Sequence, residues 1–316
     1  MLTYILFLIG FPLLIKGADI LILGASSLAL RYGIPSLVVG LTIVAFGTSA
    51  PELAVNIFSA FKGSTELIMG NIIGSNISNI LLILGVTACI ITLPAEQSTL
   101  YKEIPFSLFT IVLVAIFGFL FGGIFFITAL FFLILFLGFI YYTYCLAIKG
   151  NKDIGNQGEK NNSKSVFLSI SYIILGLLGL TLGGKWIVDG AIEIALSLGM
   201  SELVVGLTIV AIGTSLPELA TSVIAAIKKE TDIAIGNIVG SNIFNILLVL
   251  GVSGLITSIA IDGEIYRDIG VNILATILLT LFLYFSKGNK LRRVHGVVFL
   301  IFFILYVIFL AYISLT

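Results

Sequence analysis

The stretch VAFGTSAPELAV (residues 44–55) decides the fold, because it returns in the second half of the chain as VAIGTSLPELAT (residues 210–221). Around these two copies, residues 37–86 align without a gap onto residues 203–252 at a constant offset of 166, and 33 of the 50 positions are identical. The chain therefore contains a duplicated unit, with one copy in each half.

Composition places this duplicated unit in a membrane. The chain of 316 residues is 59% hydrophobic and 10% charged, and its mean hydropathy of +1.22 is far above that of soluble domains. Its apolar runs are continuous, which favours membrane helices over barrel strands, where apolar and polar residues alternate. The formal net charge is zero, so the charge balance indicates no nucleic-acid partner. We expect an all-α integral membrane protein.

Turn residues and charges divide the chain into ten expected transmembrane helices. They cover residues 2–29, 35–61, 67–93, 101–121, 124–148, 165–196, 202–227, 233–259, 268–286 and 294–314. The first of them lacks the basic start and the cleavage pattern of a signal peptide, so we expect it to be retained. A polar linker rich in Gly and Asn, residues 150–164, separates the fifth helix from the sixth. The halves are then residues 1–149, with the repeat 37–86, and residues 165–316, with the repeat 203–252.

Five spans per half is an odd number, so the second half must enter the membrane in the opposite direction to the first. Such inverted repeats with helices broken at the midplane are typical of transporters, although some channels share them. Only Lys62 and Arg267 lie in loops after even-numbered spans, whereas the loops after odd-numbered spans hold Arg31, Lys102, Lys149, Lys152, Lys160, Lys164, Lys228, Lys229, Lys287, Lys290, Arg292 and Arg293. Because positive loops stay in the cytoplasm, we expect a cytoplasmic linker, extracellular termini and a plasma-membrane location.

Each GTSxPE motif places a glutamate, Glu52 or Glu218, near the centre of an apolar span. A carboxylate at that depth costs about 3 kcal/mol on insertion scales. The preceding prolines, Pro51 and Pro217, lack an N–H group, so we expect the helices to open and to free carbonyl oxygens around residues 45–48 and 211–214. Irregular backbone at this depth faces protein or a water-filled cavity. The residues on one helical face with the glutamates are Ala45, Thr48, Ser49, Ala211, Thr214 and Ser215.

A second motif in each repeat, GNIIGSNISN (residues 70–79) and GNIVGSNIFN (residues 236–245), adds neutral polar groups. Its glycines are spaced four apart, which is typical of closely packed membrane helices. Ser75 with Asn79, and Ser241 with Asn245, share a helical face and offer oxygens to a site. The other asparagines, which are either hydrogen-bonding residues between helices or further ligands, are Asn71, Asn76, Asn237 and Asn242.

Folding the two halves about a pseudo-two-fold axis would bring Glu52 and Glu218 together in a cage of hard oxygens. The motifs contain neither sulfur nor imidazole, which disfavours soft metals and fits Ca²⁺ and Na⁺. Ca²⁺ takes six to eight oxygens, and two bidentate carboxylates with two threonine carbonyls supply about six. Two purely structural glutamates would leave the duplicated acid and the duplicated helix break unexplained.

These motifs resemble the two α-repeats of the Ca²⁺/cation antiporter superfamily, specifically the prokaryotic sodium/calcium exchangers, and the resemblance extends over nearly the whole chain. It implies that Glu52 and Glu218 bind calcium together with the backbone carbonyls of Thr48 and Thr214. It also implies sodium sites at Ala45, Ser49, Ser75, Ala211, Ser215 and Ser241, with Asn79 and Asn245 lining the centre. Some relatives have an aspartate where Asn245 stands, so its amide argues against potassium co-transport.

The resemblance further implies exchange of three sodium ions for one calcium ion by alternating access, with the first and sixth spans sliding across the core. Ions that share two carboxylates cannot occupy them together, so loading one ion expels the other. The net charge moved per cycle is worth about 2.3 kcal/mol per 100 mV and favours calcium export. We expect no prosthetic group and no obligate protein partner. The expected substrates are Ca²⁺ and Na⁺, and the protein is surrounded by the lipid bilayer.

Three other functions are consistent with parts of this pattern. Two close carboxylates can also bind protons, as in a proton/calcium antiporter, but the GTSxPE motifs favour sodium. A calcium-permeable channel needs a continuous pore and conducts without a sodium gradient. A membrane enzyme is disfavoured, because the sequence shows neither a nucleophile paired with a base nor a His/Cys metal site nor a phosphate-binding loop.

Overall fold

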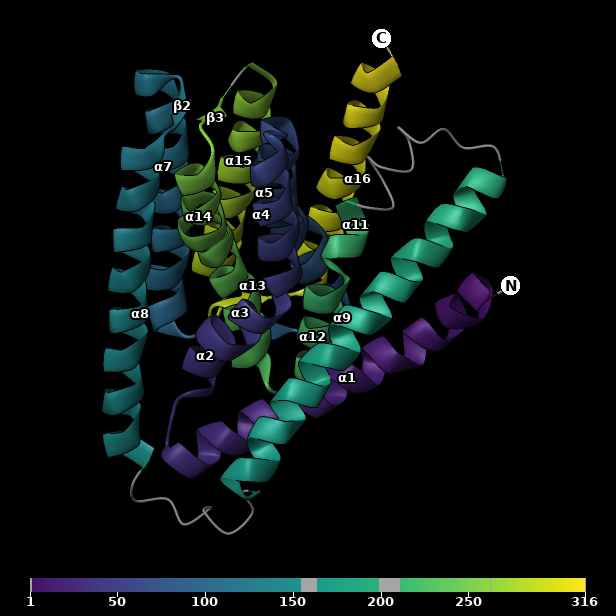
Figure 1. Cartoon of the computed structure of the whole chain (residues 1–316). Helices are drawn as coiled ribbons and strands as arrows, with labels where there is room; N and C mark the ends of the chain where they lie inside the picture. Colours follow the sequence, from purple (N-terminus) through teal and green to yellow (C-terminus); the bar gives the residue numbers. More distant parts are fainter. Residues whose placement is uncertain (1, 155–163, 199–210, 262, 316) are drawn as a thin grey trace.

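Figure 1 shows the computed structural model, which describes residues 2–154, 164–198, 211–261 and 263–315. In the first half, helices and π-helical turns (η) follow in the order α1 (Leu2–Tyr32), α2 (Ser36–Val39), η1 (Gly40–Val44), α3 (Ala45–Thr48), α4 (Ala50–Lys62), α5 (Thr65–Ser78), η2 (Asn79–Leu84), α6 (Gly85–Ile90), η3 (Thr99–Glu103), α7 (Ile104–Phe121) and α8 (Phe126–Ile154). The second half contains α9 (Val166–Ser197), α11 (Ala211–Thr214), α12 (Leu216–Ile227), α13 (Thr231–Phe244), η6 (Asn245–Leu250), α14 (Gly251–Ile256), α15 (Gly263–Phe285) and α16 (Arg293–Leu315).

Two short antiparallel ladders connect the halves outside the helices. Strand β1 (Leu93–Pro94) pairs with β4 (Lys290–Leu291), with Leu93 opposite Leu291. Strand β2 (Gly123–Ile124) pairs with β3 (Ile259–Ala260), with Gly123 opposite Ala260. Each ladder therefore joins a loop of the first half to a loop of the second half.

Eight of the described helical segments are long and apolar enough to cross a membrane, and the bent pair Ser36–Thr48 and Ala50–Lys62 makes a ninth. They correspond to expected spans, with ends that differ by a few residues. The expected span 202–227 lies partly outside the described residues, and its described part consists of α11 and α12. The protein is thus a nearly all-helical, multi-pass membrane protein.

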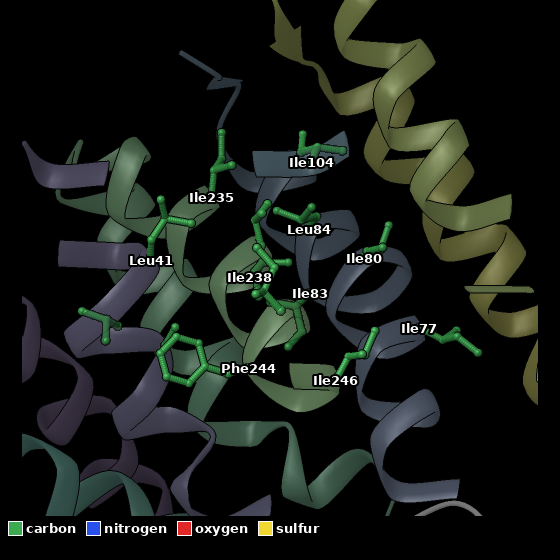
Figure 2. Close-up of a cluster of buried hydrophobic side chains, with 14 of the residues drawn as sticks. Leu41, Ile77, Ile80, Ile83, Leu84, Ile104, Ile235, Ile238, Phe244 and Ile246 are labelled. Carbon is green, nitrogen blue, oxygen red and sulfur yellow. The ribbon is translucent and has the colours of Figure 1, made fainter. Parts of the chain in front are cut away.

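The spans Thr65–Ile90 and Thr231–Ile256 form the centre of the bundle. Their most apolar stretches of 18 residues are 78% and 94% buried, compared with 17% to 39% for the other six single-helix spans. Figure 2 shows aliphatic side chains from both spans in one cluster, among them Ile80 and Ile238, which are at most 1% exposed. The second motif of each repeat lies on these two spans. The polar residues of that motif are therefore held in the most buried part of the bundle.

Helices α1 and α9 lie side by side and run obliquely across the other helices (Figure 1). Glycines set their close approach: a Cβ atom at Gly17 would lie 2.7 Å from the Leu180 nitrogen, and one at Gly176 would lie 2.6 Å from the Leu21 nitrogen. Because these neighbours are backbone atoms, a larger residue at either position would push the helices apart. α1 and α9 therefore form one closely packed pair.

The glycines of the second motif pack closely in the second repeat, as expected. A Cβ atom at Gly236 would lie 2.9 Å from the Leu37 carbonyl oxygen, and one at Gly240 would lie 2.8 Å from the Leu41 carbonyl oxygen. At Gly70 and Gly74 a Cβ atom would meet no described atom within 4 Å. The equivalent partners, residues 203–207, lie outside the described residues, so the expectation for Gly70 and Gly74 stays a prediction.

Candidate ion-binding site

The two GTSxPE motifs break their helices with the same backbone conformation. Ser49, between α3 and α4, has φ −85° and ψ 2°, and Ser215, between α11 and α12, has φ −88° and ψ 3°. These angles lie in the bridge region, outside the α-helical basin. The segments before and after Ser49 differ in direction by 45°. Pro51 and Pro217 then stand in the first turns of α4 and α12, a position that suits proline because its fixed φ angle is already helical.

The structure brings Glu52 and Glu218 together, as the sequence predicts. Both lie in the first turn of a helix, α4 or α12, where a negative charge interacts favourably with the helix dipole. They are 1% and 2% exposed, and Glu218 accepts a hydrogen bond from Ser49, which stands three residues before Glu52. Two like charges buried in one site require a cation or protons to balance them.

The break of the first repeat contacts the glutamate of the second. The Ser49 hydroxyl donates a hydrogen bond to Oε1 of Glu218 at 3.4 Å. The Thr48 hydroxyl donates to Oδ1 of Asn237 at 3.1 Å. Asn237 in turn donates to the Glu218 carbonyl oxygen at 3.5 Å. Thr48 and Ser49 therefore help to set the position of Glu218.

The expectation that the helix break frees the Ala45 carbonyl oxygen is wrong. The Ala45 carbonyl oxygen accepts hydrogen bonds from the Ser49 nitrogen at 3.0 Å and from the Thr48 hydroxyl at 3.3 Å, so it keeps partners inside its own segment. The Gly47 carbonyl oxygen, four residues before Pro51, receives no helical hydrogen bond from that residue, because proline has no N–H group. In the second repeat, Ala211 begins the described part of α11 and Thr214 ends it.

Asn79 and Asn245 each begin a π-helical turn, η2 or η6, which the sequence does not predict. Such turns are rare and occur frequently at functional sites. The Asn79 amide nitrogen donates to Oδ1 of Asn242 at 2.9 Å, and the Asn245 amide nitrogen donates to Oδ1 of Asn76 at 3.0 Å. Each amide is thus oriented by the opposite repeat.

The remaining asparagines of the second motif connect helices. Asn76 donates to the Asn242 carbonyl oxygen at 3.2 Å, and Asn242 donates to the Asn76 carbonyl oxygen at 3.4 Å. These bonds confirm the expected role of both residues between helices. Asn71 accepts a hydrogen bond from Asn56 at 2.9 Å.

Two residues that support the glutamates through hydrogen bonds are not predicted from the sequence. Asn56 donates to the Glu52 carbonyl oxygen at 2.7 Å, and Ser222 accepts a hydrogen bond from Asn237 at 3.0 Å. Asn56 and Ser222 stand four residues after Glu52 and Glu218, on the same helical faces. That spacing is the signal in the sequence that could have identified them.

The most informative feature of the site is a set of buried oxygen atoms with no hydrogen-bond partner in the described part of the chain. They are Oε2 of Glu52 and of Glu218, Oδ1 of Asn79 and of Asn245, and Oγ of Ser215 and of Ser241. Ser75, the counterpart of Ser241, is 4% exposed. Buried polar atoms normally have partners, and each exception requires an explanation. A hard cation bound by oxygens fits this set.

The donor set combines two carboxylates with neutral oxygens. Two carboxylates contribute, and the described ranges contain no group of three or more His, Cys, Asp or Glu side chains that could hold a metal ion. Neutral oxygens from serine and asparagine complete the set. Low ligand charge favours weaker binding, which suits an ion that must be released.

Comparisons with known proteins agree with this arrangement. The family model described as sodium/calcium exchanger protein matches residues 2–145 and 168–312. The sodium/calcium exchanger MaX1 of Methanosarcina acetivorans is 32% identical over 354 aligned positions, which cover 98% of this chain and 99% of that protein. The inner membrane protein YrbG of Escherichia coli is 36% identical over 87% of each chain.

Solved structures show the same fold. A structure of the sodium-calcium exchanger NCX_Mj matches with a TM-score of 0.83 and 34% sequence identity, and the match covers 96% of this chain and 97% of that one. Another structure of the same protein, soaked with Na⁺ and Ca²⁺, matches with the same TM-score of 0.83. By sequence along nearly its whole length and by fold, the chain belongs to the sodium/calcium exchanger family, within the Ca²⁺/cation antiporter superfamily.

Proposed function

We propose that this chain exchanges Na⁺ for Ca²⁺ through one shared site centred on Glu52 and Glu218. The observation that carries the proposal is the set of buried oxygens without a hydrogen-bond partner in the described part of the chain, which includes one carboxylate oxygen of each glutamate. Calcium binds between the carboxylates, with the backbone carbonyls of Thr48 and Thr214 as further ligands. A divalent ion balances both negative charges, which a single sodium ion does not.

Sodium uses the same carboxylates together with the neutral groups around them. Its ligands are drawn from Ala45, Ser49, Ser75, Ala211, Ser215 and Ser241, with Asn79 and Asn245 lining the centre. The hydroxyl oxygens of Ser215 and Ser241 have no hydrogen-bond partner among the described residues, which supports their assignment. Ala45 can contribute only its backbone, whose carbonyl oxygen already has two donors, so it is the weakest member of this set. Competition for the glutamates couples the two ions.

We further propose ten transmembrane helices in two inverted halves, residues 1–149 and 165–316, joined by the linker 150–164. Three observations support this arrangement. The family model matches two stretches, one in each half. The Asn79–Asn242 hydrogen bond has a counterpart, Asn245–Asn76, in which each residue is shifted by 166 positions. The two ladders are also related by the repeat, because each pairs the loop after the third span of one half with the loop after the fourth span of the other half.

The positive loops favour a cytoplasmic linker and extracellular termini, in a plasma membrane. In that orientation, exchange of three sodium ions for one calcium ion moves one positive charge inward per cycle. A membrane potential that is negative inside then drives calcium out of the cell. Alternating access requires the site to open to each side in turn, and the α1–α9 pair, which packs as a unit, is the candidate moving element.

The proposal is tested by calcium binding to the purified protein. Isothermal titration with CaCl₂ is performed in choline chloride, in NaCl and in KCl at equal ionic strength. We expect a calcium dissociation constant that rises at least tenfold in NaCl and stays unchanged in KCl. Equal calcium affinity in all three salts would contradict a shared site.

A further inference from the structure

A cleft with a buried carboxylate at its base lies between η3, α7 and α8, outside the ion-binding site. It has a volume of about 320 Å³, which lies within the range of small-molecule sites. Its polar lining comes from Lys102, Glu103 and Tyr142, and its apolar lining includes Phe106, Leu135 and Phe139. Helices α7 and α8 stand next to each other at the edge of the bundle (Figure 1).

Glu103 is the unusual residue of this cleft. It is 1% exposed, and its Oε1 atom accepts a hydrogen bond from the Tyr142 hydroxyl. Its Oε2 atom is buried and has no hydrogen-bond partner in the described part of the chain, although Lys102 lines the same cleft. A buried carboxylate oxygen without a donor is costly. Oε2 therefore calls for a donor that the described protein atoms do not supply.

The rest of the cleft suits a hydrocarbon chain. The rings of Phe106 and Phe139 stack with centroids 5.7 Å apart. Gly138 lines the cleft on an exposed face of α8, and a Cβ atom there would meet no described atom within 4 Å. Only 28% of the most apolar stretch of this span is buried, so most of α8 faces the lipid. The cleft is therefore open to the bilayer beside Gly138.

Its depth in the membrane matches that of lipid head groups. Glu103 is the fifth residue of the span Thr99–Phe121, which places it about 6 Å from the end of that span. Head groups and hydrocarbon meet at this depth. Lysine and tyrosine, the types found at Lys102 and Tyr142, are enriched at this boundary.

We propose that this cleft binds a phosphatidylethanolamine molecule of the surrounding bilayer. Its primary ammonium group donates to Oε2 of Glu103, its phosphate pairs with Lys102, and an acyl chain lies along Phe106, Leu135 and Phe139. The charge pattern selects this head group. The quaternary ammonium of phosphatidylcholine has no N–H to donate, and phosphatidylglycerol has no cation for the carboxylate.

The test is native mass spectrometry of the full-length protein, purified in detergent and titrated separately with phosphatidylethanolamine, phosphatidylcholine and phosphatidylglycerol of identical acyl chains. We expect the first phosphatidylethanolamine to bind at least tenfold more tightly than the first phosphatidylcholine. Glu103→Gln should abolish this preference, because a neutral amide does not pair with ammonium. Gly138→Leu should weaken binding of both lipids by filling the cleft from its open side.

Glu66→Gln, a change at an exposed residue of α5, is the matched control and should retain the preference. Thermal unfolding of each variant in detergent shows whether it is folded. If Glu103→Gln unfolds, Gly138→Leu still decides the question, because it adds atoms to an open face. Equal affinities for the three lipids in the unmodified protein, a preference that survives in folded Glu103→Gln, or unchanged lipid binding by Gly138→Leu would each overturn the proposal. Tightest binding of phosphatidylglycerol would overturn it as well.

Discussion

Thr48 of the first repeat donates a hydrogen bond of 3.1 Å to Asn237 of the second repeat, and Asn237 also contacts the Glu218 backbone and the Ser222 hydroxyl. One buried amide thus connects the helix break of one half to the glutamate of the other. Asn237 is 0% exposed, so water does not replace these bonds when they are lost.

Asn237→Ala should therefore affect both stability and ion binding. We expect a loss of about 1–3 kcal/mol in unfolding free energy, because buried donors and acceptors are left unpaired. Since Glu218 and Thr48 lose their support, we also expect calcium affinity to fall about tenfold or more, as for residues that orient metal ligands. Ser222→Ala is the comparison, because it removes one partner of Asn237 and leaves the bond to Thr48 in place. Unchanged calcium affinity in Asn237→Ala would show that this amide serves packing alone.

Glu52→Gln and Glu218→Gln should each abolish sodium-driven calcium uptake while the protein stays folded. Each change keeps the shape of the side chain and removes half of the site's negative charge. The measurement is uptake of radioactive calcium into proteoliposomes, with size-exclusion profiles as evidence of folding. Glu66→Gln serves as control. Robust uptake by either glutamine variant would remove that residue from the site.

Asn245→Ala should weaken calcium binding without unfolding the protein. The change deletes a buried Oδ1 atom that has no hydrogen-bond partner in the described part of the chain, and also the hydrogen bond to Asn76. We expect a drop in calcium affinity of about tenfold, close to the cost of one hydrogen bond to an ion. Titration calorimetry measures it. Asn245→Ala with unaltered affinity for both calcium and sodium would place Oδ1 outside the ion cage.

Gly17→Ala should separate α1 from α9. The added methyl group would lie 2.7 Å from the Leu180 nitrogen and 2.9 Å from the Gly176 carbonyl oxygen, so the backbones must move. We expect a destabilisation of about 1–3 kcal/mol, the usual cost of overpacking. Gly270→Ala, in α15, is the control, because its methyl group would meet no described atom within 4 Å. A Gly17→Ala protein as stable as Gly270→Ala would contradict the close packing of this pair.

Much of this architecture could be predicted from the sequence, because its strongest signals are local. A proline beside a glutamate in an apolar span indicates a helix break at a polar site, and the structure bends at Ser49, two residues before Pro51. Continuous apolar runs define most of the spans. Constant spacing between the repeats also identifies the polar positions that correspond to each other.

Other features depend on contacts that no local pattern records. The π-helical turns at Asn79 and Asn245 lie in segments that are apolar on nearly all faces, so periodicity does not distinguish 3.6 residues per turn from a wider helix. Proline alone suggests several freed carbonyls, but Ala45 keeps its donors because Ser49 and Thr48 fold back onto it. The cleft at Glu103 is formed by segments about 40 residues apart in the chain, and it becomes visible only when η3 and α8 are packed.

The most direct test of the shared site is calcium uptake into proteoliposomes that contain the purified protein. Vesicles are loaded with sodium, potassium or acid and diluted so that an outward gradient of sodium, potassium or protons exists, and a fourth set has no gradient. Competition for Glu52 and Glu218 predicts that only the sodium gradient drives uptake. Because three sodium ions leave for each calcium ion that enters, one positive charge moves outward per cycle, so this uptake should become faster when the vesicle interior is made positive. Uptake driven by protons alone, or uptake without any gradient, would contradict coupled exchange of sodium for calcium.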